Sequence, residues 1–282
     1  MIHSFLMIGQ SNMAGRGYRT EVPPIYDEHI KMQRNGLWQI MSEPINFDRP
    51  SAGVGLAASF AASWRLDNPE EEIGLIPCAD GGTSLDDWAV GGALFENAVS
   101  QAKLAQRTSQ LSGILWHQGE NDCSPEKAER YGEKFSVIIE TLHQELNIPK
   151  VPLIIGGLGD FLSKGIFGQY FTSFPLMNQA LEDFAKTHSN CYFVTAKGLT
   201  ANADNIHFNA LSQRVLGIRY YKTFRDLRHL PEPDNDEESI LTTIYNRPYT
   251  KTENIKLLEH EFAIGNIEPK DFLSELTILS GK

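Results

Sequence analysis

The sequence predicts an α/β protein in which a parallel sheet is covered by helices on both faces. Short apolar runs typical of buried strands alternate along the chain with longer segments of helical periodicity. Strands that alternate with helices pair in parallel through right-handed crossovers, and this connection places helices on both faces of the sheet. The chain of 282 residues is long enough for one sizeable core of this kind.

Five segments have the composition of strands and five have that of helices. The expected strands are residues 4–9, 72–77, 111–117, 151–157 and 190–196, which predicts a five-stranded sheet. The expected helices are residues 55–66, 93–106, 125–146, 175–188 and 210–230. The third helix has a clear start, because the Ser124 hydroxyl can cap its first turn and Pro125 suits its first position.

The C-terminal part of the chain differs from the rest in charge and pattern. Five acidic residues lie within residues 232–238 and predict a solvated linker. We therefore divide the chain into a main domain, residues 1–230, and an extension, residues 231–282. Within the extension, residues 239–250 have a strand-like pattern and residues 254–279 a weakly helical one. Because so short a segment is near the lower limit for an independent core, we expect it to pack on the main domain or on a second copy in a homo-oligomer.

Charge and composition limit the classes of partner and compartment. The net charge of -11 repels nucleic-acid backbones and anionic membrane surfaces, so we expect neither partner. No run approaches the roughly 18 apolar residues of a membrane span, and the first residues lack a basic leader. The three cysteines, Cys78, Cys123 and Cys191, lie far apart, which suits free thiols in a reducing compartment. These features together predict a cytoplasmic protein.

Polar, glycine-rich segments follow three of the expected strands. GQSNMAG (9–15) follows the first strand, CADGGTSLDDW (78–88) the second and HQGEND (117–122) the third. A fourth segment, ADNIHFN (203–209), precedes the last long helix. Because the carboxyl ends of parallel strands lie at one edge of the sheet, we expect these segments to form a site there.

Three residues of these segments have the chemistry of a nucleophilic site. The hydroxyl of Ser11 can attack a substrate only if a base takes its proton, and that base needs a carboxylate to fix its tautomer. His207 and Asp204, three residues apart at the mouth of a helix, offer both groups. Taken alone, Ser11 is more typical of a helix cap than of a nucleophile, and Asp204 and His207 are typical of a capping aspartate followed by a surface histidine.

Two further segments offer donors for a developing oxyanion. Gly81 and Gly82 let a backbone amide approach a ligand closely, and the side chain of Gln118 can donate to the same oxygen. Carboxylates and imidazoles at positions 117, 120, 122, 204 and 207 would also permit a metal site, but their spacing matches no familiar ligand pattern. Because a metal would leave Ser11 and the glycines without a role, we expect neither a metal nor an organic cofactor.

Taken together and in this order, GQSNMAG, GGTSLDDW, WHQGEND and DNIHFN resemble the block motifs of SGNH hydrolases. They most resemble carbohydrate esterase family 6 and its sialate O-acetylesterase-like and acetyl xylan esterase-like members. The resemblance covers roughly residues 1–230. It implies a flavodoxin-like, three-layer α/β/α sandwich that acts as an esterase without a cofactor.

The resemblance also implies a role for each residue in these motifs. Ser11 would be the nucleophile, His207 the base and Asp204 the acid that orients it. The backbone amides of Ser11 and Gly82 and the side chain of Gln118 would form the oxyanion hole.

The same resemblance leaves alternatives open at three positions. Gln118 replaces the asparagine that most SGNH hydrolases have in the third block, and Gly81 is a substitute for Gly82. Glu120 is an alternative to Asp204 as the partner of the histidine, or else a group that bonds to the loop bearing Ser11.

The motifs and the acidic surface predict a serine esterase that removes O-acetyl groups from carbohydrates such as acetylated xylo-oligosaccharides. Gln10 and Asn12 are candidates for contact with the sugar, and Trp88 is our preferred candidate for stacking on it, ahead of Trp38 and Trp116. One alternative is a thioesterase, lipase-like esterase or acyltransferase, for which residues 159–175 would line an acyl groove or cover the site. The other alternative is a sugar-binding module without turnover.

Overall fold

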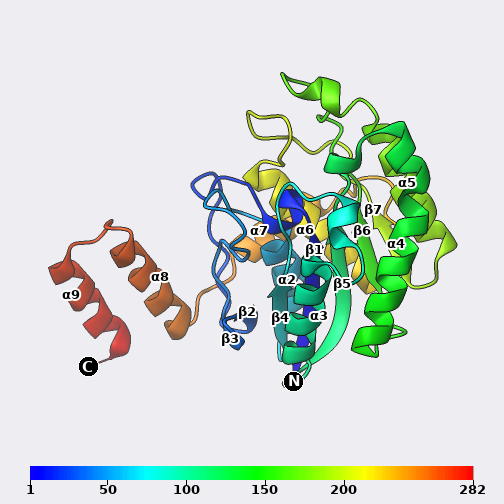
Figure 1. Cartoon of the computed structure of the whole chain (residues 1–282). Coiled ribbons are helices and arrows are strands. Elements are labelled where there is room, and N and C mark those ends of the chain that lie inside the picture. The colour runs from blue at the N-terminus through cyan, green and yellow to red at the C-terminus, as the bar shows by residue number, and fades with distance from the viewer. Residues whose placement is uncertain (282) are drawn as a thin grey trace.

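The structure, a computed structural model that describes residues 1–281, confirms the α/β class. It contains one sheet of seven strands in the order β3-β2-β4-β1-β5-β6-β7 (Figure 1). Neighbouring strands are parallel except for β2 and β3, which are antiparallel. The strands are β1 Ile2–Gly9, β2 Ile30–Arg34, β3 Leu37–Ile40, β4 Glu72–Pro77, β5 Ser109–His117, β6 Leu153–Gly156 and β7 Cys191–Val194.

The five expected strands are all present, but the expectation of a five-stranded sheet is wrong. The two further strands, β2 and β3, form a hairpin at the edge of the sheet. Asn35 and Gly36 connect them with positive φ angles of 52° and 76°, as a tight hairpin turn requires. This hairpin was missed because β3 is exposed or half-buried along its length. A strand that is not buried on both faces does not need the continuous apolar run by which the other strands were predicted.

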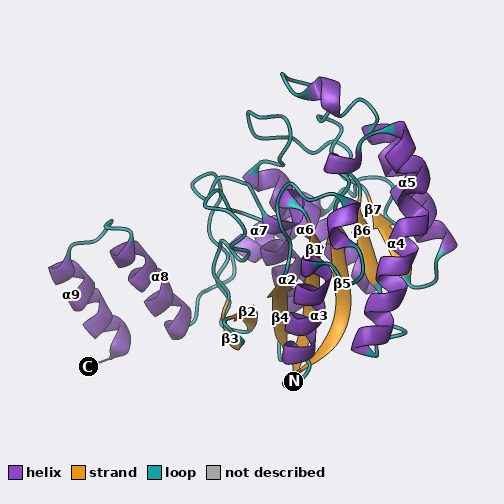
Figure 2. Ribbon diagram, viewed as in Figure 1, coloured by secondary structure: helices purple, strands orange, loops and turns teal. Residues whose placement is uncertain are grey.

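Helices cover both faces of the sheet and complete a three-layer sandwich (Figure 2). Helices α2 and α6 pack against each other on one face, whereas α3, α4 and α5 pack in sequence on the other. The helices of the main body are α1 Ser11–Ala14, α2 Leu56–Asp67, α3 Ala93–Ala105, α4 Pro125–Leu146, α5 Phe174–Thr187 and α6 Ala210–Asp226. Three short 3-10 turns, η1 Leu85–Trp88, η2 Glu120–Asp122 and η3 Gly168–Tyr170, lie in the connections.

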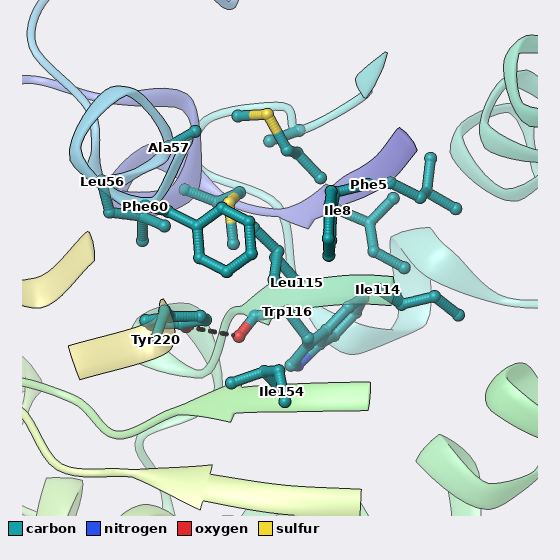
Figure 3. Close-up of a cluster of buried hydrophobic side chains, with 14 of the residues drawn as sticks. Phe5, Ile8, Leu56, Ala57, Phe60, Ile114, Leu115, Trp116, Ile154 and Tyr220 are labelled. Atoms are coloured by element: carbon teal, nitrogen blue, oxygen red, sulfur yellow. Dashed lines mark hydrogen bonds between the residues drawn. The ribbon is translucent and has the colours of Figure 1, made fainter. Parts of the chain in front are cut away.

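The core lies on both sides of the central strands β1 and β5. Phe5 of β1 packs edge to face on Phe60 of α2, with ring centroids 4.9 Å apart. Figure 3 shows these side chains together with Trp116 of β5 and Tyr220 of α6. The Tyr220 hydroxyl donates a hydrogen bond of 2.7 Å to the Trp116 carbonyl, which ties α6 to the end of β5. The polar segments therefore begin at strand ends that the core holds in a rigid position.

The acidic segment before residue 239 is mostly exposed, but Asp234, Asp236 and Glu237 also pair with cations of α6. Arg219, a buried residue of α6, donates to the Glu237 carboxylate at 2.6 Å. Lys222, also buried on α6, pairs with Asp236 at 2.5 Å and with Asp234. The acidic residues therefore neutralise cations of α6 that would otherwise be buried without partners.

The expected strand at residues 239–250 is also wrong. Most of that segment belongs to a helix, α7 Glu237–Tyr245, which packs on α2 and α6. The remaining extension forms a hairpin of α8 Lys251–Ala263 and α9 Pro269–Ser280 that projects from the main body (Figure 1). Helix α8 contacts the body through Glu253, which accepts from the Glu28 amide at 2.9 Å, whereas α9 packs on α8 and has no buried residue. The helical pattern expected there is confirmed, while the division at residue 230 and a homo-oligomer stay predictions. Within the described chain, no helix is both long and apolar enough to cross a membrane.

Candidate active site

Ser11 lies at the carboxyl edge of the sheet, because the central strand β1 ends just before it. Gly9 is the last residue of β1, and Gln10 connects it to Ser11, the first residue of α1. The Gln10 amide donates to the His117 carbonyl at 2.9 Å, which holds the end of β1 against the end of β5. Gly9 has a φ of 135°, and a Cβ atom built on it would overlap that same carbonyl. Only glycine therefore fits at the strand end that presents Ser11.

We expect Gly9→Ala to lower the free energy of unfolding by more than about 2 kcal/mol, because backbone strain and steric overlap add. Gly198→Ala is the matched control, since Gly198 also has a positive φ of 77° but has open space around it. The control should lose only about 1 kcal/mol. Urea unfolding of both variants measures the difference. Equal losses would contradict the steric argument.

The structure brings Ser11, His207 and Asp204 into one line. The Ser11 Oγ atom is 2.9 Å from His207 Nε2, and His207 Nδ1 is 2.7 Å from Asp204 Oδ2. An imidazole that donates its Nδ1 proton to a carboxylate presents Nε2 as an acceptor for the serine proton. The side chains of His207 and Asp204 are 23% and 37% exposed, so the line opens to solvent. Such a line can transfer the serine proton as the hydroxyl attacks a bound ester.

The Asp204 carboxylate is held by its own loop. Its Oδ1 atom accepts hydrogen bonds from the backbone amides of Ile206, at 2.8 Å, and of His207, at 3.0 Å. Partial burial alone would raise the pKa of Asp204, but these amides and the His207 ring outweigh it and lower the pKa below its ordinary value. The carboxylate is therefore ionised at neutral pH and fixed in the orientation that the histidine needs.

The loop after β4 places backbone amides beside Ser11. A Cβ atom built on Gly81 would lie 3.4 Å from Ser11 Cβ, so this glycine borders the serine directly. The Gly81 amide donates to Asp48 Oδ2 at 2.8 Å and is already used. The amides of Gly82 and Ser11 have no acceptor among residues 1–281. Of the two glycines, Gly82 therefore has the amide that can still receive a ligand.

A buried ion pair supports that loop, and the sequence did not indicate it. Arg16 donates to both carboxylate oxygens of Asp48, at 3.2 Å and 2.5 Å, and both side chains are at least nine-tenths buried. Burial alone would raise the pKa of Asp48, but the Arg16 hydrogen bonds and charge, with the Gly81 amide, lower it. The two residues lie 32 positions apart, so no local pattern could have identified them.

Gln118 lies inside the protein, which differs from the role expected of it. Its Nε2 atom is 2.6 Å from Asp122 Oδ2 and 3.2 Å from both Gln10 Oε1 and the Thr83 carbonyl. Its Oε1 atom accepts from the Tyr131 hydroxyl at 2.7 Å. Gln118 is fully buried, and both amide protons have protein acceptors. In this structure it holds the loops around the site and presents no free donor to an oxyanion.

The three residues expected to contact the sugar are also buried, which corrects that expectation. Trp88 is 1% exposed and packs edge to face on Trp116 at 5.5 Å, so it belongs to the core. Gln10 accepts hydrogen bonds from the Gln118 side chain and the Gly119 amide, at 3.2 Å and 3.3 Å. Asn12 is likewise bonded to protein groups on all sides. None of the three reaches the surface on which a sugar would bind.

Glu120 does not contact His207. Its Oε1 atom accepts from Asn12 Nδ2 at 2.5 Å and lies 3.5 Å from His117 Nε2. Glu120 therefore lies beneath the helix that begins with Ser11, as one of the two alternatives for it predicted. Asp204 is the carboxylate that reaches the histidine ring.

A serine, a histidine and an aspartate in line at the carboxyl edge of a parallel sheet define a class of site found in α/β ester hydrolases. More particularly, the chain belongs to the carbohydrate esterase family of sialic acid-specific acetylesterases, whose model matches residues 1–226. The resemblance stated from the four motifs is thereby confirmed. The protein is a carboxylic ester hydrolase of this family.

Individual relatives agree with this assignment. A probable carbohydrate esterase of Arabidopsis thaliana is 29% identical over 239 residues, which are 76% of this chain and 86% of that protein. The crystal structure of this Arabidopsis protein matches 79% of the chain and 98% of its own, with a TM-score of 0.71 and 27% identity. The structure of a protein named NanS matches 80% of this chain and 97% of its own with a TM-score of 0.67, and at 15% identity this likeness concerns the fold alone.

Proposed function

We propose that the protein is a serine esterase that removes O-acetyl groups from uncharged carbohydrates through an acetyl-enzyme. The observation that carries this proposal is the line from Ser11 Oγ through His207 to Asp204, with separations of 2.9 Å and 2.7 Å. Ser11 attacks the acetyl carbonyl while His207 takes its proton. The carbon–oxygen bond to the sugar then breaks, and His207 returns the proton to the departing sugar hydroxyl. Water repeats both steps on the acetyl-enzyme and releases acetate.

The developing oxyanion is stabilised by backbone amides. Ser11 and Gly82 supply the two donors, because both amides are free of protein acceptors in the described chain and Gly81 borders the serine. Gln118 acts indirectly, since its amide bonds to the carbonyl of Thr83 next to Gly82. Arg16 and Asp48 hold the same loop from beneath through Gly81.

The charges around the site favour a neutral sugar. Three basic side chains near the site loops are paired: Arg49 with Asp80 at 2.9 Å, Lys127 with Asp122 at 3.2 Å and Lys134 with Asp86 at 2.5 Å. Lys164, in the loop between β6 and α5, is exposed and forms no ion pair within residues 1–281. Asp204 adds a partly exposed carboxylate next to His207. A substrate that carries its own carboxylate would be repelled by Asp204, and the exposed Lys164 would offset only part of that repulsion, because an exposed charge interacts weakly in water.

We therefore expect acetylated xylo-oligosaccharides to exceed O-acetylated sialic acid in kcat/KM by at least about tenfold, equivalent to about 1.4 kcal/mol of repulsion. Acetate release from both substrates, at equal concentration, measures the ratio. The ratio should fall at high ionic strength, because salt screens exposed charges. A preference for the sialic acid would instead assign an anionic sugar to the site and overturn the charge argument.

One observation supports a second candidate, an esterase for longer acyl chains. The loop between β6 and α5 exposes three large apolar side chains, Ile166, Phe167 and Tyr170. Gly165 in this loop packs against Asn205, the neighbour of Asp204, so the loop lies beside the proposed site. A series of p-nitrophenyl esters from acetate to octanoate decides between the candidates, because an apolar groove would favour the longer chains.

A further inference from the structure

A buried asparagine joins the three segments that form the site. Asn12 follows Ser11 in α1 and is 1% exposed. Its Nδ2 atom donates to Glu120 Oε1 at 2.5 Å and to the Ile206 carbonyl at 3.2 Å. Its Oδ1 atom accepts from the Phe208 amide at 3.1 Å. Both amide protons and the side-chain oxygen are therefore used, and the side chain has a single orientation.

Two of these contacts hold the residues on either side of the histidine. Ile206 precedes His207 and Phe208 follows it, so Asn12 fixes the backbone before and after the imidazole. Because Asn12 is also the neighbour of Ser11, the same side chain relates the helix of the nucleophile to the loop of the base. A rigid relation between two reacting groups matters, since a displacement of about 1 Å can cost about 10²-fold in rate.

The third contact fixes Asn12 itself. Glu120 is 3% exposed, follows β5 and accepts a short hydrogen bond from Asn12 Nδ2. Burial alone would raise the pKa of Glu120, but interactions with His117 and the Asn12 hydrogen bond outweigh it and hold its pKa below the ordinary value. An ionised acceptor makes this bond stronger than one between neutral groups.

We propose that Asn12, held by Glu120, is a positioning residue that sets the separation between Ser11 Oγ and His207 Nε2. It acts through the backbone of the base and does not touch the substrate. The inference rests on the proposed function of Ser11 and His207. It predicts that an amide is required at this position, because aspartate would replace both donors with acceptors and place a second carboxylate against Glu120.

The test compares kcat and KM separately for p-nitrophenyl acetate, per folded molecule as measured by circular dichroism. We expect Asn12→Ala to lower kcat by about 10²-fold while KM stays within about twofold, because the side chain makes no substrate contact. Asn12→Asp should lower kcat at least as much. A residue that only stabilises the fold would lower Tm and leave kcat of the folded enzyme unchanged.

Conservative replacement of the partner gives a second, independent readout. Glu120→Gln keeps an acceptor oxygen for Asn12 and should retain kcat within about fivefold, whereas Glu120→Leu should match Asn12→Ala. Asn68→Ala is the matched control, since the Asn68 side chain also donates to a backbone carbonyl, that of Trp64 at 2.8 Å, just beyond the C-terminal end of α2. The control should not change kcat.

Two results would contradict the positioning role of Asn12, and one would contradict the proposed function. If Asn12→Ala keeps kcat within twofold of the wild type while Ser11→Ala is inactive, the positioning role is wrong and the proposed function stands. If Ser11→Ala keeps its activity, the proposed function itself fails. Should the Asn12 variants not fold, equal kcat values for Glu120→Gln and Glu120→Leu would overturn the positioning role.

Discussion

Replacing Ser11 by alanine is expected to reduce kcat for acetyl ester hydrolysis by about 10⁶-fold. The remaining rate is that supplied by the oxyanion donors and substrate binding alone. The hydroxyl that lies 2.9 Å from His207 Nε2 is the atom that forms the acetyl-enzyme in the proposed reaction, and alanine has no substitute for it. Acetate release from an acetylated xylo-oligosaccharide measures the loss. Mass spectrometry of the wild type after treatment with an organophosphate should find one label, on Ser11.

A matched serine separates this effect from a general loss of structure. Ser63 is 2% exposed in α2, and its hydroxyl donates to the Ser59 carbonyl at 2.8 Å. Ser63→Ala removes a buried hydroxyl of the same kind outside the site, so its kcat should equal that of the wild type. If both variants lose activity equally, or if Ser11→Ala remains active, Ser11 is not the nucleophile.

The parts of the fold that the sequence predicted are those with strong local patterns. The five buried strands are continuous apolar runs, and the long helices have clear periodicity and caps. The hairpin of β2 and β3 was missed because it lies at an edge and is partly exposed. Helix α7 was taken for a strand because its short segment is rich in β-branched residues, and packing on α2 and α6 outweighs that preference.

The site was predictable where its chemistry lies close together in sequence. Asp204 and His207 are three residues apart, and the loop that contains them supplies the geometry directly. Burial was not predictable, because it depends on tertiary contacts: Trp88 and Gln118 have polar or aromatic side chains typical of a binding site, yet both lie in the interior. The supporting pair of Arg16 and Asp48 was missed for the same reason.

Asp204→Asn is expected to lower kcat by about 10⁴-fold, the loss that the same change causes in serine proteases. The amide is the same size as the carboxylate, but it cannot stabilise the imidazolium and no longer selects the tautomer that presents Nε2 to Ser11. Asp67→Asn is the matched control, since Asp67 accepts a hydrogen bond of 2.5 Å from Tyr221 in a different part of the molecule.

Comparing Asp204→Asn with Glu120→Gln in the acetyl ester assay then decides between the two carboxylates. A large loss of kcat for Glu120→Gln and a small one for Asp204→Asn would reverse the assignment. The reason is that glutamine at position 120 still accepts the hydrogen bond from Asn12, so this variant should lose much activity only if Glu120 is the acid.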